Sequence, residues 1–200
     1  RDWSVTGVQT CALPIFQAPG TSKTASATDI VGNKFPTALS CVAVEIDGKQ
    51  APITYVDASQ INVQAPTTVA LGDVAVRVIL NPGTANERRS AAFTIKMDEV
   101  APALFRFLPT PCVAAIFPNT GVLAADPALV PNSVKPKVGE IVSIFATGLG
   151  VSEPVYQSGE ITPGNVAPRA RDQVQVEFNG VVMNASDILY VGLTDRKSVV

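Results

Sequence analysis

The side chains that could perform chemistry in this sequence are few, and they are not grouped. There is no histidine, so a Ser/His/Asp or Cys/His nucleophile system and the commonest metal ligand are both missing. Asp98, Glu99, Glu140 and Glu153 could act as a general acid and base, but none of them has a discernible partner carboxylate. We therefore predict that the chain is not an enzyme and holds no catalytic, cofactor-binding or metal site.

Two short motifs resemble ligand sites and have simpler explanations. The Gly-Leu-Gly of residues 148–150 follows an expected strand, as in dinucleotide-binding proteins, but no helical pattern follows it and Pro154 intervenes. We interpret it as a tight turn that ends a strand. Asp98 and Glu99 lie between two expected modules, where oxygen ligands can hold Ca²⁺, although a dedicated site needs about six oxygens. We favour an ordinary polar linker there.

Cysteines and tyrosines fit packing roles. Cys41 and Cys112 could form a disulfide in an exported protein, but they fall in different expected modules, so we favour single packed thiols. Tyr55 and Tyr190 are expected to pack at sandwich edges with a hydroxyl that reaches the backbone, and a sugar-stacking platform is the alternative.

Composition and charge restrict the fold and the partners. A formal net charge of −2 gives no basic face for a nucleic-acid backbone. The longest apolar stretch, residues 112–130, is interrupted by Pro118, Gly121 and Pro127, so we expect no membrane span in this chain. Abundant Val, Ala and Thr, with 16 prolines and 14 glycines, favour many short strands joined by turns. The fold class is therefore predicted to be all-β.

One strand–turn–strand unit occurs twice. VAVEIDG begins at Val42 and VQVEFNG begins at Val174, 132 positions later, and each ends in a dipeptide that suits a tight hairpin turn. Tyr55 and Tyr190 match at a spacing of 135, which places three more residues in the second hairpin. Chance similarity between two hairpins is the alternative. We interpret the chain as two tandem β-sandwich modules.

Alternation of apolar and polar residues locates the expected strands. The clearest pattern is VAVRVIL, in which every second residue is a candidate for one buried face. The expected strands are residues 40–46, 51–56, 60–64, 74–80 and 91–96 in the first module, and residues 139–150, 174–178 and 188–191 in the second.

The two ends of the chain resemble something other than protein-coding sequence. VTGVQTCALPI, residues 5–15, resembles a translated short-read sequencing adapter, and DRKSVV, residues 195–200, resembles the complementary adapter. A signal-peptide-like stretch and a polar tail are the alternative. We expect residues 1–16 and 195–200 to be adapter-derived artefacts, and the fold is predicted without them.

The interior resembles a known family. PTALSCVAVEIDGKQAPITYVDASQINVQAP, then APALF, then KVGEIVSIFATGLG occur in this order. Together they resemble an uncharacterised family of repeat-bearing proteins of soil acidobacteria, and the resemblance covers nearly all of residues 17–194. It implies immunoglobulin-like modules of the IPT/TIG kind, near the C-terminus of large secreted or surface proteins, without assigned catalytic residues. Cys41 stands where that family usually has a small residue.

The resemblance sets the expected domains. Residues 17–98 would form an Ig-like module that lacks its first strand, and residues 99–137 a connecting hairpin and linker. Residues 138–194 would form a second Ig-like module that lacks its C-terminal strands, so both modules are expected to be truncated.

The resemblance also sets the expected function, a non-catalytic structural or adhesive module of a larger secreted or cell-surface bacterial protein. Its expected partners are neighbouring domains of the same polypeptide and a cell-surface protein or polysaccharide, with no nucleic acid. The alternative is a carbohydrate-binding accessory module of an exported polysaccharide-active enzyme.

Overall fold

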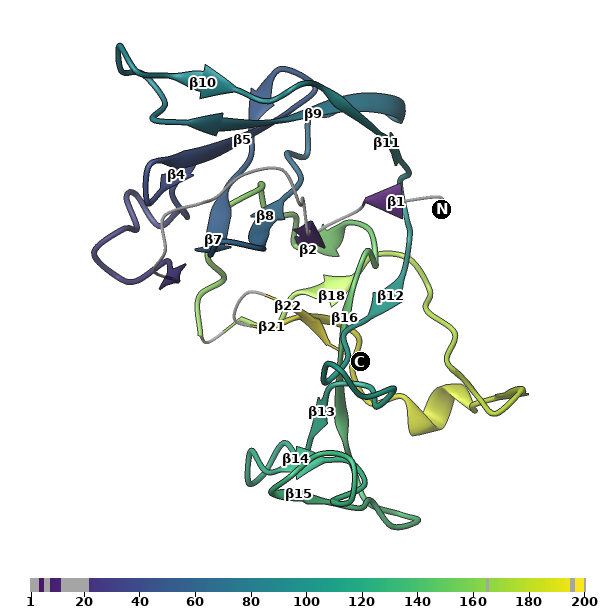
Figure 1. Cartoon of the computed structure of the whole chain (residues 1–200). Helices are drawn as coiled ribbons and strands as arrows, with labels where there is room; N and C mark the ends of the chain where they lie inside the picture. Colours follow the sequence, from purple (N-terminus) through teal and green to yellow (C-terminus); the bar gives the residue numbers. More distant parts are fainter. Residues whose placement is uncertain (1–3, 6–7, 12–21, 165, 195–196, 200) are drawn as a thin grey trace.

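The computed structural model describes residues 4–5, 8–11, 22–164, 166–194 and 197–199. In these residues the chain is essentially all-β, and its one helical segment is the 3₁₀ turn η1 (Ala185–Asp187). The all-β prediction is confirmed. Two bodies of sheet follow one another along the chain, and Figure 1 draws the first in the upper half of the view and the second below it.

The first body contains two sheets that face each other. One runs in the order β1-β11-β9-β5-β4, with β6 beside β5 and β10 beside β9. Its strands are β1 (Ser4–Val5), β4 (Ala38–Leu39), β5 (Val42–Ile46), β6 (Lys49–Gln50), β9 (Gly72–Leu80), β10 (Arg88–Arg89) and β11 (Phe93–Met97). The other runs in the order β2-β8-β7-β3. Its strands are β2 (Val8–Cys11), β3 (Lys23–Thr24), β7 (Ile53–Val56) and β8 (Ile61–Gln64).

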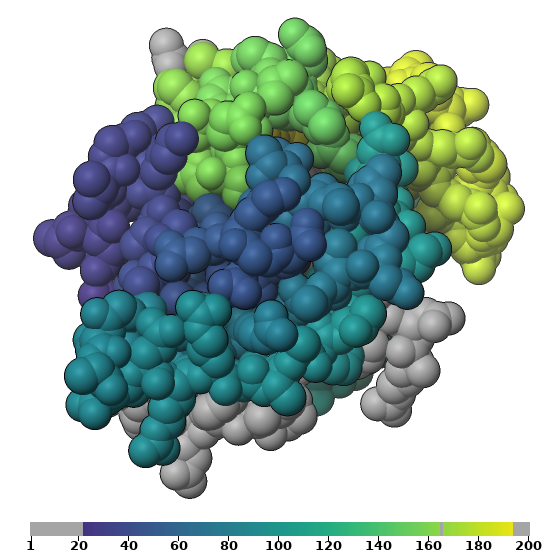
Figure 2. Space-filling view, turned by 90° about the horizontal axis from the view of Figure 1, so that it is seen from above, coloured from purple at the N-terminus to yellow at the C-terminus, as the bar shows by residue number. Residues whose placement is uncertain are grey.

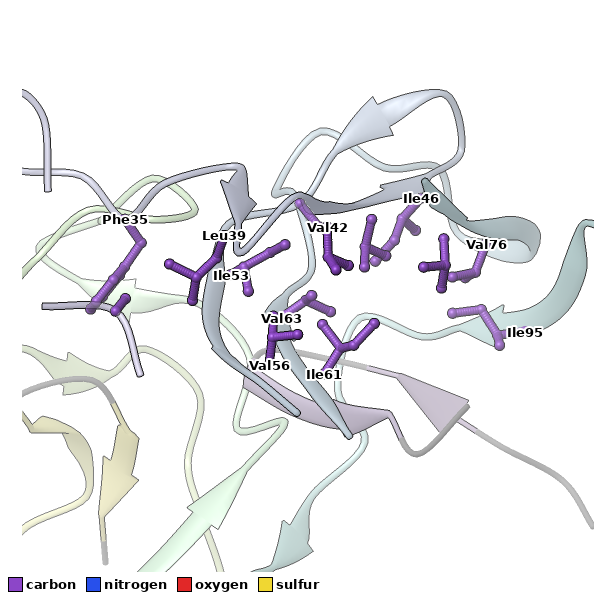
Figure 3. Packing of buried hydrophobic residues seen from close by; sticks show 14 of the residues in the cluster. Phe35, Leu39, Val42, Ile46, Ile53, Val56, Ile61, Val63, Val76 and Ile95 are labelled. Carbon is purple, nitrogen blue, oxygen red and sulfur yellow. The ribbon is translucent and has the colours of Figure 1, made fainter. Parts of the chain in front are cut away.

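The core lies between these two sheets, which we call the first sandwich. Figure 3 shows Val42, Ile46 and Val76 of one sheet pointing toward Ile53 and Val63 of the other. All five side chains are buried, because each strand turns its alternate apolar residues to the same face. The alternation predicted over residues 74–80 is confirmed at its centre, where β9 pairs with β5 on one side and β11 on the other.

The second body is one long sheet. It runs in the order β15-β14-β13-β16-β22-β21-β18-β17, with β12 also beside β16. Its strands are β12 (Ala103–Leu104), β13 (Ala115–Ile116), β14 (Leu123–Ala124), β15 (Ser133–Val134), β16 (Ser143–Thr147), β17 (Ser152–Glu153), β18 (Arg169–Ala170), β21 (Gly192–Thr194) and β22 (Lys197–Val199). We call it the second sheet. Most of its strands are two residues long, and the hydrophobic core cluster of the described residues comes almost entirely from the first sandwich.

The repeated unit forms a hairpin in both places. β19 (Glu177–Phe178) and β20 (Val181–Val182) make a two-stranded sheet of their own. Their pairs, Glu177↔Val182 and Phe178↔Val181, have the register of the β5–β6 pairs Glu45↔Gln50 and Ile46↔Lys49 at the predicted spacing of 132. The sequence therefore repeats a hairpin in the same register, although only its first copy lies inside a sandwich.

Several predicted strand limits are wrong, for local reasons. The strand expected at residues 139–150 is only β16, because Gly139 and Gly148 have φ of 88° and 73°. β5 begins at Val42, because Ser40 and Cys41 form the turn from β4 with φ of 50° and 60°.

The last predicted strands also differ. The strand expected at residues 174–178 is limited to β19, and residues 188–191 form no strand but connect η1 to β21, which begins at Gly192. The match of Tyr55 with Tyr190 does not extend to structure, since Tyr55 lies in β7 and Tyr190 lies outside any strand.

The predicted fold omits residues 1–16 and 195–200, but the strands that the structure describes within these segments pair with other strands. β1 pairs with β11, β2 with β8, and β22 with β16 and β21. The remainder of residues 1–16 and 195–200 lies outside the described residues. The open edge of a sheet can pair with any extended segment, whatever its sequence. These pairings therefore do not test the adapter origin, which stays a prediction.

Candidate functional site

The most specific arrangement of polar groups lies where the second sheet meets the first sandwich. The loop between β17 and β18 crosses to the first sandwich over residues 157–161. Phe35 N donates to Gly159 O at 2.9 Å, and Ile161 N donates to Asn33 O at 3.0 Å. Asn33 Nδ2 donates back to Ile161 O at 2.9 Å, and Lys34 Nζ lies 3.6 Å from Glu160 Oε1. The loop is therefore joined to the first sandwich by backbone pairing.

Gly159 fits its place in this junction only because it has no side chain. Its N–H donates to Gln64 Oε1 at 2.6 Å. It is buried, with φ of +84°, and a Cβ atom there would lie 2.8 Å from Cγ of Pro52. Pro52 is itself buried in the first sandwich, so a larger residue would push the loop off this surface. Figure 2 shows the green surface of this part of the chain directly against the blue surface of the first sandwich.

A cleft of about 740 Å³ opens beside the junction. Its apolar wall is contributed by both bodies, and includes Leu71, Met97, Leu149, Val151, Tyr156 and Leu193. Its carboxylates are Asp98, Glu99 and Glu160.

Each cleft carboxylate has a basic neighbour. Asp98 Oδ1 lies 3.4 Å from Lys96 Nζ, and Glu99 Oε1 lies 3.2 Å from Arg171 Nη2. The basic neighbour of Glu160 is Lys34, in the ion pair already described at the junction. Each of the three carboxylates thus lies in an ion pair with a basic side chain, as surface charges commonly do.

The four predicted candidate carboxylates are not brought together. Asp98 and Glu99 line the cleft, whereas Glu140 accepts a hydrogen bond from Lys137 N at 2.8 Å in a turn, and Glu153 is exposed in β17. In the part of the chain that the structure describes, no three His, Cys, Asp or Glu residues are grouped in a way that could hold a metal ion. The arrangement can therefore position a loop and line a cleft.

The Gly-Leu-Gly of residues 148–150 lies directly after the end of β16, outside any strand. Gly148 and Gly150 have φ of 73° and 81°, and Ala101 N donates to Gly148 O at 3.0 Å. A Cβ atom on Gly150 would lie 2.9 Å from Cγ1 of Val100. This segment lies against the residues that precede β12 and forms one wall of the cleft.

The two tyrosines are held by different hydrogen bonds. Tyr190 Oη lies 2.7 Å from Pro168 O and 2.8 Å from Leu193 O, and its one hydrogen is shared between these two acceptors. The Arg169 guanidinium lies 5.3 Å from the ring centroid. Burial raises the pKa of Tyr190, against an opposing effect of Arg169. The predicted contact with backbone is confirmed for Tyr190. It is wrong for Tyr55, whose hydroxyl donates to Asp57 Oδ2 at 2.7 Å.

Asp57 organises the turn between β7 and β8. Its Oδ1 atom accepts hydrogen bonds from Ser59 N at 2.6 Å and Gln60 N at 2.7 Å. The hydrogen bond from the Tyr55 hydroxyl, followed by those from Ser59, lowers the pKa of Asp57 to about 2. These hydrogen bonds favour the charged carboxylate, so the lowered pKa of Asp57 reflects its role in holding the turn.

Cys41 and Cys112 take no part in the junction. Both are free thiols, with Cys41 exposed in the β4–β5 turn and Cys112 half-buried before β13. The predicted packing is therefore wrong for Cys41. Sequence reasoning missed the residues that matter more at the junction, namely Asn33, Gln64 and Gly159. The sequence signal for Gly159 was a loop rich in glycine and proline, which does not indicate what the loop contacts.

Comparison with family models, with curated protein sequences and with solved structures found no match to this chain. The search for long apolar helices in the described residues found none that could cross a membrane. The fold and the junction define an all-β protein in which a sandwich-like body is joined to a second sheet by a specific loop.

Proposed function

We propose that this chain is a non-catalytic structural or adhesive segment, built from Ig-like modules of the IPT/TIG type, in a larger secreted or cell-surface bacterial protein. The observation that carries the proposal is the docking of residues 157–161 on the first sandwich. Backbone hydrogen bonds in both directions, together with the buried Gly159–Pro52 contact, hold two sheet bodies in one orientation. A spacer that presents loops to a partner needs such a fixed orientation, because it transmits position along the chain.

The test is a distance measurement across the junction. With Cys11→Ser, spin labels on Cys41 and Cys112 report from the first sandwich and from the second sheet. We expect a single narrow distance distribution for the otherwise unchanged chain. Gly159→Val should broaden it, because the added side chain meets Pro52. Gly164→Val is the matched control, because a Cβ atom on Gly164 meets nothing within 4 Å. A broad distribution in the unchanged chain would contradict a spacer role, and reproducible turnover of a substrate by purified protein would contradict a non-catalytic one.

The cleft favours a second candidate function, carbohydrate binding as an accessory module of an exported polysaccharide-active enzyme. Tyr156 offers an aromatic surface in a cleft that also contains the side chains of Gln64, Gln157 and Asp98. Sugars bind through this combination of stacking and planar polar groups. Screening the chain against plant and microbial glycans tests the idea, with Tyr156→Ala as the variant expected to lose any retained glycan. Absence of a retained glycan would remove this candidate and leave the spacer role untouched.

A further inference from the structure

The second copy of the repeated hairpin keeps the geometry of the first. Beyond the two shared strand pairs, Met183 N donates to Val176 O at 2.9 Å, and the matching residues of the first copy make the same bond, from Ala51 N to Val44 O at 2.8 Å. The backbone correspondence therefore continues through three successive positions of the hairpin. What covers the first copy is consequently a guide to what would fit the second.

The two copies differ in what surrounds them. Ile46 in the first copy is 1% exposed, whereas its counterpart Phe178 is 77% exposed. Val181, which pairs with Phe178, is 68% exposed. Figures 1 and 2 both show the yellow-green segment that contains this hairpin at the periphery of the molecule. The apolar position that is buried at Ile46 in the first copy is thus exposed at Phe178 in the second.

The missing neighbour can be identified from the first copy. There, β9 runs antiparallel along the outer edge of β5, with Glu45 opposite Arg77 and Ile46 opposite Val76. In the described part of the chain, β19 has β20 as its strand neighbour and its outer edge is open. The backbone groups of Glu177 that correspond to those of Glu45 face this edge. An open strand edge of this kind can accept an extended peptide.

Charge adds a requirement on the partner. Glu45 Oε2 lies 3.1 Å from Arg89 Nη1, and Glu45 Oε1 lies 3.8 Å from Arg77 Nη1 on the facing strand. Glu177 is the counterpart of Glu45, is exposed, and has no ion-pair partner among the described residues. A strand that fits the open edge should therefore place a basic side chain opposite Glu177, between apolar side chains that lie beside Val176 and Phe178.

We propose that the outer edge of β19 binds an extended segment of another polypeptide by antiparallel strand addition, and that this segment carries a basic residue between β-branched apolar residues. The segment would take the place that β9 takes beside β5. This inference uses only the hairpin of residues 174–183 and does not depend on the junction or the cleft.

The probe is a synthetic peptide with the sequence of residues 72–80, Gly-Asp-Val-Ala-Val-Arg-Val-Ile-Leu, labelled with a fluorophore through a Gly-Ser tail. Its binding to the whole chain is followed by fluorescence anisotropy. We expect saturable binding that Glu177→Lys weakens roughly two- to fivefold, the range for one cross-strand charge pair. A peptide in which Arg77 is replaced by Glu should bind the unchanged chain equally weakly, and it should recover affinity for the Glu177→Lys chain.

Further variants separate the site from general stickiness. Phe178→Lys, at the position that matches the buried Ile46 opposite Val76, should also weaken binding. Val138→Lys is the control, because Val138 is a fully exposed apolar residue that is not part of the hairpin. Recovery by the charge-reversed peptide shows that the Glu177→Lys chain is folded.

Several results would overturn the proposal. Lack of peptide binding would do so, as would binding that neither Glu177→Lys nor Phe178→Lys changes, since the peptide would then occupy another place. A concentration-dependent dimer of the chain alone that either variant abolishes would also overturn it, because the edge would then take a second copy of this chain.

Discussion

Asp47 and Asn179 occupy the same position of the same turn, 132 residues apart. Their φ angles are 52° and 50°, and the glycines that follow them have φ of 73° and 79°. Both pairs give the left-handed geometry that connects two antiparallel strands through a two-residue turn. Because the turns match and their surroundings differ, paired substitutions separate what the local sequence contributes from what packing contributes.

Matching substitutions in the two hairpins should change the free energy of unfolding by different amounts, because only the first hairpin is buried in a core. Ile46→Ala removes a side chain that is buried between the two sheets of the first sandwich, so it should lower the free energy of unfolding by about 2–5 kcal/mol. Phe178→Ala changes the matching residue, which is mostly exposed, and should alter the same quantity by no more than about 0.5 kcal/mol. Urea denaturation followed by far-UV circular dichroism measures both. Equal losses for the two variants would mean that the second hairpin is also packed.

A Cβ atom added to the turn glycine should cost the same local free energy in both hairpins. Only the substitution in the first hairpin should also loosen the first sandwich. Gly48→Ala and Gly180→Ala each place a Cβ atom on a left-handed residue, which costs about 1 kcal/mol locally. Gly48→Ala should accelerate hydrogen exchange of the Ala51 amide, which donates to Val44 O, together with that of the β5–β9 ladder. Gly180→Ala should accelerate exchange of the Met183 amide alone. Residue-resolved exchange by NMR is the measurement.

The parts of the fold that sequence reasoning reached are those with a strong local pattern. Valine at every second position from Val74 onward specifies β9, and the Asp47–Gly48 and Asn179–Gly180 dipeptides specify both hairpins. These signals are short in range, so they depend little on the remainder of the chain.

The junction could not be read from the sequence, because it depends on contacts between distant residues. Gly159 looks like any loop glycine until Pro52 is placed against it, and Gln64 looks like any strand residue until Gly159 N points at it. The second sheet was only partly predicted for a related reason. Its two-residue strands carry too few residues to show an alternation.

Acid should destabilise the first sandwich through Asp57. The hydrogen bond from Tyr55 and those from Ser59 lower the pKa of Asp57 to about 2, against its ordinary value of 3.8. A carboxyl with a depressed pKa in the native state binds fewer protons there than in the unfolded state, so stability rises with pH between these values. We therefore expect a contribution that is complete above about pH 4 and is lost as the pH falls toward 2.

A second aspartate should contribute to the same pH dependence. Asp29 accepts hydrogen bonds from Lys23 and Ser26, and its pKa is also lowered to about 2. Asp57→Asn should reduce the loss of stability between pH 4 and pH 2, and Asp29→Asn in addition should reduce it further. Denaturation midpoints at pH 5, 3.5 and 2 provide the comparison. An unchanged pH dependence in Asp57→Asn would contradict the assigned cause.

Substitution of Tyr190 should weaken the pairing of β18 with β21 slightly, whereas substitution of Gly192 should disrupt it. Tyr190→Phe removes a hydrogen bond to the Pro168 carbonyl, which still accepts from Leu193 N at 2.9 Å, so the loss should be about 1 kcal/mol. Gly192→Ala would bring a Cβ atom into the Pro168 carbonyl and the Arg169 backbone, neither of which can rotate away. The β18–β21 pair, Arg169↔Gly192, should then separate.

Hydrogen exchange of the Leu193 and Ala170 amides distinguishes these two effects. Leu193 N donates to Pro168 O, and Ala170 N donates to Val191 O, so both amides report on the β18–β21 contact. Tyr190→Phe should leave both protected but less so, because the backbone pairing remains. Gly192→Ala should remove most of the protection of both. Gly164→Ala, where a Cβ atom meets nothing, should leave both amides unchanged. Full protection in Gly192→Ala would show that the close approach of Pro168 to Gly192 is not required for this edge.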